Sequence, residues 1–164
     1  MTIERPALER QVLAAIQASP PRIPVLVGAS GAGRSAALLR LRDLVGRQAC
    51  QYVDVERIAT TPERFLEALC AASPFGVPPS AAPAGARQAF DAALAYLSDT
   101  RAPGGAPATF LLDEILELRT FESFPGLRNV MRDLLAALAA SANRYVLSSR
   151  YTARARRLLR DAPP

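Results

Sequence analysis

The sequence predicts an α/β protein built as a three-layer αβα sandwich around a mainly parallel sheet. Three observations lead to this fold class. Short apolar runs alternate with longer stretches of helical periodicity, each run is apolar on both faces, and the first run ends in a glycine-rich turn. A strand that is apolar on both faces is typical of a sheet covered from two sides. The four runs are residues 23–27, 51–55, 108–112 and 145–148.

The first 45 residues predict a helix, a strand and a second helix. Residues 6–19 carry apolar side chains at helical spacing, and the Ser-Pro-Pro run at 19–21 ends that helix. A strand over 23–27 leads into the glycine-rich turn, and residues 33–45 return to helical spacing. The apolar positions of the two helices are Leu8, Val12, Leu13, Ile16, Leu38, Leu41 and Val45.

The middle of the chain predicts a strand, a helix and a long connection. The strand covers residues 51–55, where tyrosine and valine favour β-structure. Thr60 and Glu63 have capping-box spacing, so we expect a helix to begin there. Residues 73–86 contain four prolines and two glycines, which predicts a surface loop. The apolar face of the helix consists of Phe65, Leu66 and Leu69.

The second half of the chain predicts two more strands among three helices. Helical periodicity predicts a helix over residues 87–98 and a second helix that begins near Gly126. A third helix is expected after the last strand. The strand at 108–112 is expected to be central, because it is apolar throughout. Phe121 and Phe124 are interpreted as packing residues. The core positions of the Gly126 helix are Leu127, Val130, Met131, Leu134, Leu135 and Leu138.

Length and composition predict one domain. Its 164 residues divide into a lead-in over 1–22, a core over 23–150 and a basic C-terminal helix over 151–164. The sequence has no long apolar run and no signal-peptide pattern, so we expect a cytoplasmic protein with no membrane partner. Cys50 and Cys70 are expected to be reduced, buried thiols. The chain has no histidine, so a bound metal is expected to be a hard cation with oxygen ligands.

Most of the net charge of +5 is concentrated near the end of the sequence, and all 20 basic residues are arginine. The basic helix is interpreted first as a solvated face. Contact with nucleic acid through residues 150–160, which is not favoured, and a protein interface or phosphate contact are the alternatives. The concentrated charges are Arg150, Arg154, Arg156, Arg157 and Arg160, opposed by Asp161.

Residues 28–35 have the spacing of a phosphate-binding loop, with arginine where lysine normally stands. Glycines let successive backbone N–H groups turn toward phosphate oxygens, and the helix that begins at Gly33 adds its N-terminal dipole. The hydroxyl of Ser35 is placed to bind Mg²⁺. The alternative is a plain glycine turn between strand and helix. The expected nucleotide-binding residues are Gly28, Ser30, Gly31, Ala32, Gly33, Arg34 and Ser35.

Two carboxylates follow the third strand. Asp113 and Glu114 come directly after the apolar run at 108–112. Ligands of open α/β sheets bind at the carboxyl ends of the strands, where the glycine loop also lies. Asp113 can therefore bind Mg²⁺, directly or through water, and Glu114 can polarise an attacking water molecule. The alternative is a solvated acidic loop.

The fourth strand ends in Ser148-Ser149-Arg150. A serine at this end is expected beside the carboxylate strand, where it can orient water or contact a terminal phosphate; we assign this role to Ser149. Arg150 offers a forked cation that suits phosphate oxygens. The alternative is an ordinary arginine at the start of a helix.

The order of these motifs resembles the AAA+/STAND branch of the P-loop ATPases, over roughly residues 24–150. In that branch the glycine loop and the carboxylate strand are called Walker A and Walker B, and the Ser-Ser-Arg end is similar to the sensor strand of STAND ATPases. The resemblance implies a P-loop nucleoside triphosphate hydrolase fold, ATP and Mg²⁺ as cofactors, and a conformational switch driven by ATP hydrolysis. Catalytic roles would fall to Glu114, Ser149 and Arg150, with Ser35 and Asp113 on the metal.

Two departures from that family qualify the resemblance. Arg34 replaces the lysine that contacts the β- and γ-phosphates, and a guanidinium is larger than an ammonium. A nucleotide-dependent regulator or scaffold that does not hydrolyse ATP is therefore the alternative, with a small-molecule P-loop kinase as a third possibility. Family members also continue with a fifth strand and a helical lid, so we expect this sequence to be a partial version. An arginine finger would have to come from a neighbouring subunit or from missing sequence, so a protein partner or a homo-oligomer is among the expected partners.

Overall fold

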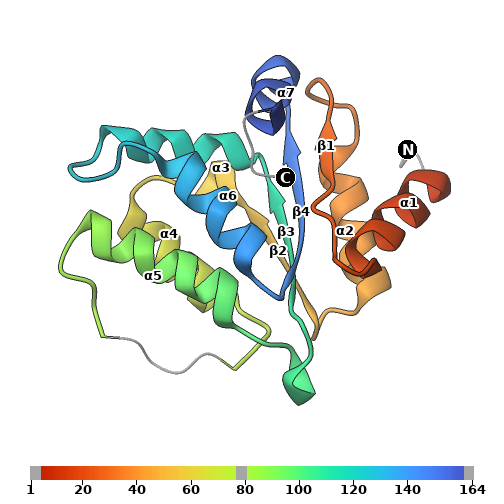
Figure 1. Ribbon diagram of the computed structural model, residues 1–164, viewed down its shortest axis with the longest axis horizontal. Coiled ribbons are helices and arrows are strands. Elements are labelled where there is room, and N and C mark those ends of the chain that lie inside the picture. The colour runs from red at the N-terminus through yellow and green to blue at the C-terminus, as the bar shows by residue number, and fades with distance from the viewer. Residues whose placement is uncertain (1–4, 77–80, 161–164) are drawn as a thin grey trace.

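The structure is a computed structural model that describes residues 5–76 and 81–160. Strands and helices alternate along the chain (Figure 1). The strands are β1 (Val25–Val27), β2 (Cys50–Asp54), β3 (Thr109–Asp113) and β4 (Arg144–Ser149). The α-helices are α1 (Pro6–Gln17), α2 (Arg34–Val45), α3 (Val55–Ile58), α4 (Pro62–Ala71), α5 (Ala86–Asp99), α6 (Val130–Ala140) and α7 (Thr152–Arg160). The 3-10 helices are η1 (Pro103–Gly105) and η2 (Ile115–Ser123).

The described residues form one four-stranded sheet in the order β1-β4-β3-β2, in which every pair of neighbours is parallel. All five residues of β3 are buried, and this strand lies between β4 and β2, which confirms its predicted central position. Asp54 at the end of β2 is in register with Asp113 at the end of β3. The carboxyl ends of the strands therefore lie at one edge of the sheet, as expected for parallel strands.

Helices cover both faces of the sheet (Figure 1). Helices α1 and α2 pack on one face, where a small buried cluster includes Leu38 and Leu111. Helices α4, α5 and α6 pack on the other face together with η2, over a larger cluster that includes Phe110 and Leu112. This alternation along β3 is consistent with the predicted three-layer sandwich. Among the described helices, none is both long and apolar enough to cross a bilayer.

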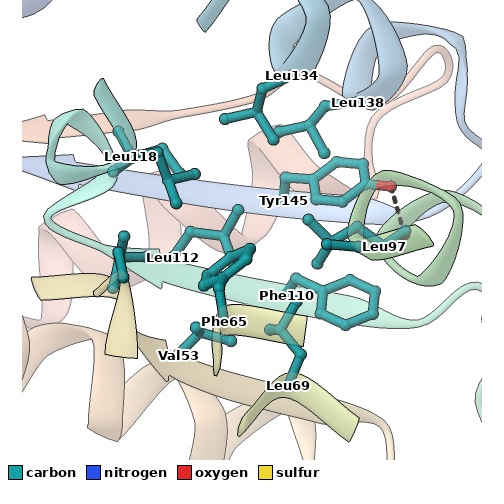
Figure 2. Packing of buried hydrophobic residues seen from close by; sticks show 14 of the residues in the cluster. Val53, Phe65, Leu69, Leu97, Phe110, Leu112, Leu118, Leu134, Leu138 and Tyr145 are labelled. Atoms are coloured by element: carbon teal, nitrogen blue, oxygen red, sulfur yellow. Dashed lines mark hydrogen bonds between the residues drawn. The ribbon is translucent and has the colours of Figure 1, made fainter. Parts of the chain in front are cut away.

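The larger cluster is centred on the ring of Phe110, which is fully buried. Phe75 and Tyr96 meet this ring edge-on at centroid distances of 5.6 and 5.8 Å, and Tyr145 stacks on it at 6.0 Å. The hydroxyl of Tyr145 donates a hydrogen bond of 2.8 Å to the carbonyl of Leu97 (Figure 2). These contacts fix β3 against β4, and so they also fix the polar residues at the ends of both strands.

The start of α4 differs from the expectation by one position. Thr61, and not Thr60, is the N-cap, because its Oγ1 accepts a hydrogen bond of 3.2 Å from the backbone N–H of Arg64. Pro62 then occupies the first helical position, where its missing N–H costs nothing.

The segment between β3 and α6 was left undefined by the sequence pattern and forms the 3-10 helix η2. Phe121 is buried there against Phe65 and Phe90, which confirms its predicted packing role. Helix α6 begins at Val130 and not near Gly126, because Gly126 has a φ of +81° that an α-helix cannot contain.

The predicted surface loop at 73–86 is only partly on the surface. Phe75 is buried against Phe110, although prolines and glycines surround it in the sequence. Residues 77–80 lie outside the described part of the chain. Cys50 and Cys70 are free thiols, as expected, but only Cys50 is buried, and Cys70 is partly exposed. Burial raises the pKa of Cys50 to about 12.

Candidate functional site

A cavity of about 340 Å³ opens at the carboxyl edge of the sheet. Loop residues 30–36 form one wall, and Asp113, Glu114 and Arg150 also line it. These elements are far apart in the sequence, and the strand order brings them together because β4 lies between β1 and β3. The volume falls within the range of small-molecule sites.

The glycine loop has the backbone geometry that its sequence predicts. Gly31 and Gly33 have φ values of +78° and +80°, which side chains rarely adopt. A Cβ atom at either position would meet nothing within 4 Å, so the space beside the loop is open. Gly28 is needed for a different reason, because a Cβ there would lie 3.2 Å from that of Ala32. The first N–H groups of α2, which begins at Arg34, lack intrahelical partners and border the cavity.

Asp113 is buried and both of its oxygens accept hydrogen bonds. Ser148 Oγ donates to Oδ1, and the hydroxyl of Tyr52 donates to Oδ2 over 2.8 Å. Burial, followed by this bond to Asp113, raises the pKa of Tyr52, whereas a hydrogen bond with Ser35 acts in the opposite direction. Tyr52 therefore interacts with both residues that the sequence assigns to the metal.

Glu114 is the only described residue other than glycine with a positive φ. Its backbone angles, φ 57° and ψ 48°, lie in the left-handed region, which costs about 1–2 kcal/mol for an L-residue. The Glu114 N–H donates to Ser148 Oγ over 3.0 Å, and Oε2 accepts a bond of 3.0 Å from the N–H of Arg150. Strained residues that their surroundings hold in place cluster at functional sites.

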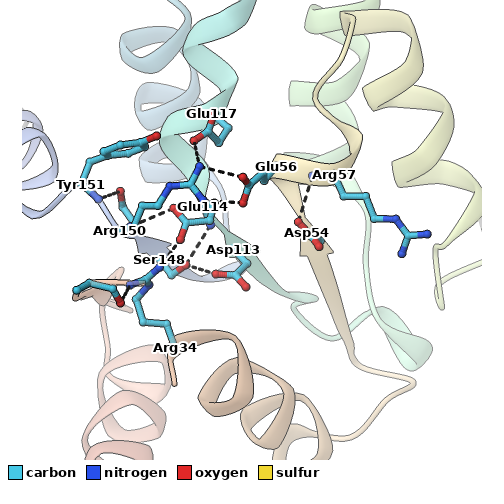
Figure 3. A network of polar contacts seen from close by, with 12 residues as sticks. Arg34, Asp54, Glu56, Arg57, Asp113, Glu114, Glu117, Ser148, Arg150 and Tyr151 are labelled. Atoms are coloured by element: carbon cyan, nitrogen blue, oxygen red, sulfur yellow. Dashed lines mark hydrogen bonds and ion pairs between the residues drawn. The ribbon is translucent and has the colours of Figure 1, made fainter. Parts of the chain in front are cut away.

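Arg34 folds back over the loop and binds Glu114 (Figure 3). Its Nη1 donates to the carbonyls of Gly28 and Ala29, the latter over 2.7 Å, and its Nη2 donates to Glu114 Oε1. The Arg34 and Glu114 side chains are 10% and 8% exposed, so this ion pair is nearly buried. Arg34 Nε is buried without a hydrogen-bond partner among the described residues. One donor beside the loop is thus left for an acceptor that residues 5–76 and 81–160 do not supply.

Arg150 is held by two carboxylates in this structure. Its guanidinium donates to both oxygens of Glu56, over 2.8 and 2.9 Å, and to Glu117 over 2.8 Å (Figure 3). The hydrogen bond to Glu56, followed by an interaction with Tyr151, raises the pKa of Arg150, and the bond from Arg150 lowers the pKa of Glu56. The side chain of Arg150 is 29% exposed, so the pairs are partly hydrated and open to exchange.

Ser149, which the sequence assigns to the site, does not line the cavity. It is fully buried, and its hydroxyl accepts a hydrogen bond of 3.0 Å from the N–H of Tyr151. Its neighbour Ser148 occupies the expected place beside the carboxylates, because side chains alternate along a strand and Ser148 points toward Asp113. Ser148 donates to Asp113 and accepts from Glu114, so it links the acidic pair.

Sequence reasoning missed three site residues from β2 and its end. Tyr52 lies within β2, Asp54 is the last residue of that strand, and Glu56 follows it on α3. Asp54 and Glu56 line the cavity, and Tyr52 binds Asp113. A signal was present, since the carboxyl end of any parallel strand next to the carboxylate strand must reach the same edge. Glu117, on η2, had no such signal, because its position depends on the path of a 3-10 helix.

A second cavity, of about 280 Å³, lies on the other side of the glycine loop. It shares residues 32–34 with the first cavity and is otherwise mainly apolar. Leu8 from α1, Val25 and Val27 from β1, and Ala37 from α2 contribute to its lining. The loop therefore stands between a charged cavity and an apolar one.

The arrangement can bind an anion at the loop and hold a carboxylate close to it. No group of three or more histidine, cysteine or acidic residues in the described ranges could hold a metal by itself. A hard cation that keeps its water and takes ligands from a bound phosphate needs no such group. No protein-family model and no curated protein matches this chain.

Proposed function

We propose that this chain is a P-loop module of the AAA+/STAND type that binds Mg²⁺–ATP and hydrolyses it as a conformational switch. One observation carries the proposal: the glycine loop, Asp113, Glu114 and Arg150 line a single cavity although they come from three different strand ends. A plain glycine turn or a solvated acidic loop would not require this convergence.

The phosphate groups would lie against residues 30–35. The open space beside Gly31 and Gly33 and the N-terminus of α2 suit an anion, because the N–H groups and the helix dipole are both directed at it. The unpartnered Nε of Arg34 would gain a phosphate oxygen as its acceptor.

The residues present fit a Mg²⁺ ion bound through Ser35 and Asp113. Both oxygens of Asp113 already accept hydrogen bonds from Ser148 and Tyr52, so Asp113 would hold a metal-bound water through a remaining lone pair. Mg²⁺ in such a site neutralises the charge that develops on phosphate oxygens. Ser35 would contribute its hydroxyl directly.

Glu114 would orient and deprotonate the attacking water. Its carboxylate is buried and accepts a hydrogen bond from the N–H of Arg150, and the bond from its backbone N–H to Ser148 holds the main chain in place. Because Arg34 binds this carboxylate in the structure, the guanidinium must move toward the phosphates before Glu114 can accept a proton. Arg150 must similarly exchange Glu56 for a phosphate oxygen.

The apolar cavity on the other side of the loop would take the base. It shares residues 32–34 with the phosphate cavity, so one ligand can occupy both. Leu8 and the β1 valines offer apolar surface for a flat ring, and Arg5 adds a guanidinium that can stack on it.

One specific observation favours the second candidate function, a nucleotide-dependent regulator that does not hydrolyse ATP. Arg34 binds the intended base Glu114 and two loop carbonyls at once. If those three bonds persist when nucleotide is bound, the chain binds ATP and leaves it intact.

The experiment combines binding of a fluorescent ATP analogue with steady-state phosphate release, with and without Mg²⁺. We expect Glu114→Gln to retain binding and to lower phosphate release by about 10²–10⁴-fold. Glu67→Gln, an exposed acid on α4, is the matched control and should leave both unchanged. Binding without release in the unaltered protein would establish the regulator, and absence of nucleotide binding would refute both functions.

A further inference from the structure

A second charged region lies where η2, α6 and α7 meet, and its lining residues are not among those that line the nucleotide cavity. Its deeper part is a cavity of about 260 Å³, and its wider part, of about 420 Å³, shares Leu116, Arg119, Glu122 and Arg154 with it. The two parts form one continuous depression, which we call the arginine groove. The five arginines of the deeper part are Arg119, Arg128, Arg132, Arg154 and Arg157.

The charge of the arginine groove is poorly balanced. Among the described residues, Arg128, Arg154 and Arg157 take part in no ion pair, and Glu122 is the only acid that lines the deeper part. The other two arginines have only loose contacts, of 3.5 and 4.0 Å, with a nearby acid. Like charges gathered from three separate elements repel one another unless an anion joins them.

The spacing of these arginines suits a row of phosphates. Arg154 and Arg157 are three residues apart on α7, so their Cβ atoms are about 5–6 Å apart on one helix face. Each guanidinium presents a planar fork that matches two phosphate oxygens. The Arg154 guanidinium lies 5.2 Å from the ring centroid of Tyr151, which limits its freedom before any ligand arrives.

The deeper part of the groove also carries apolar residues. Leu116 and Met131 are only 7% and 5% exposed, and Leu158 is half-buried. The carboxylates of an acidic protein segment would pair with the same arginines, so an experiment must distinguish that occupant from a phosphodiester chain. A phosphodiester chain needs only the cations.

We propose that the arginine groove binds the phosphodiester backbone of a nucleic acid. Binding is electrostatic, independent of base sequence and strongly dependent on salt. The site is separate from the nucleotide cavity, so this property stands whether or not the chain hydrolyses ATP.

The test is fluorescence anisotropy of the full chain with a labelled 30-nucleotide oligothymidine and a labelled 30-base-pair duplex. Five phosphate contacts give a log–log salt slope of about −3.5 to −4.5, which means an affinity loss of about 100–500-fold between 50 and 200 mM salt. Comparison of the affinities for the two probes shows whether the groove prefers single-stranded or double-stranded nucleic acid.

The decisive variants are R154Q/R157Q in the groove and R47Q/R64Q elsewhere. Arg47 and Arg64 are 70% and 73% exposed, so the second pair removes the same charge from ordinary surface. We expect R154Q/R157Q to lower affinity at 50 mM salt by about tenfold or more and to flatten the salt slope by about 1.4–1.8. R47Q/R64Q should stay within about twofold of the unaltered protein, and thermal melting should show that both variants fold.

Three results would overturn the proposal. The first is no binding of either oligonucleotide at 50 mM salt, and the second is an equal loss of affinity in both variants. The third is binding of labelled polyglutamate, but of neither nucleic acid, that depends on Arg154 and Arg157. This third result would assign the groove to an acidic protein segment.

Discussion

Replacing Arg34 by methionine in the nucleotide-free protein removes one partner of a nearly buried ion pair. The carboxylate of Glu114 would keep one hydrogen bond, from the N–H of Arg150, and the carbonyls of Gly28 and Ala29 would lose their side-chain donor. Loss of one member of a buried pair costs about 3–5 kcal/mol. For a chain of this length, that lowers the melting temperature by about 6–20 °C.

Glu114→Gln should cost less, about 1–3 kcal/mol, because the amide oxygen still accepts from Arg34. The double variant R34M/E114Q leaves no unpaired charge, so we expect a coupling energy of about 1.5–3 kcal/mol between the two sites. Urea denaturation followed by circular dichroism measures all four members of the cycle. Arg64 and Glu67, an exposed pair 3.7 Å apart, form the control cycle and should couple by at most about 0.5 kcal/mol.

A coupling energy for Arg34 and Glu114 as small as that of the surface pair would refute the reasoning. It would mean that Arg34 does not neutralise Glu114 in the free protein, and the structural basis of the regulator alternative would disappear.

Arg34→Lys should raise steady-state phosphate release, because one ammonium cannot hold Glu114 and two loop carbonyls together; unchanged or lower release contradicts an impaired site. Gly33→Ala should lower the free energy of unfolding by about 1–2 kcal/mol and weaken nucleotide binding, because φ is +80° at this position. The control Ala136→Gly, at an exposed position on α6, should leave nucleotide binding intact. The pKa of Cys50 is about 12 in the folded protein, whereas the same thiol has a pKa of about 9 in the unfolded chain. The free energy of unfolding should therefore fall as the pH rises from 9 toward 12, by about 2 kcal/mol at pH 10.5. The midpoint of urea denaturation measures this loss, which should be smaller in Cys50→Ala.

The regular elements followed from the sequence because apolar periodicity reports burial directly. The central position of β3 was predictable, since a strand that is apolar on both faces must be covered on both. Helix α3 was missed because four residues are too few to show a period. The 3-10 helix η2 was missed because its period of three residues differs from the α-helical spacing that was sought. Phe75 was missed for another reason: prolines and glycines around a residue describe its backbone and say nothing of where its ring packs.

The site was predictable where strand ends and backbone conformation determine it. A strand–loop–helix pattern predicts the backbone conformation of Gly31 and Gly33. The shared edge of the sheet predicts that Asp113 and Glu114 lie near this loop. The partners of the arginines were not predictable, because a long side chain can reach any acid within several ångströms. That Arg34 binds Glu114, 80 positions away, depends on three-dimensional packing that no local pattern contains.

Glu117 would couple the two proposed sites negatively. It lines the wider part of the arginine groove and also accepts a hydrogen bond from Arg150, which lines the nucleotide cavity. If Arg150 turns to a phosphate, Glu117 loses its cation and leaves a negative charge beside the groove. Nucleotide would then weaken nucleic-acid binding, and thermodynamic linkage requires nucleic acid to weaken nucleotide binding by the same factor.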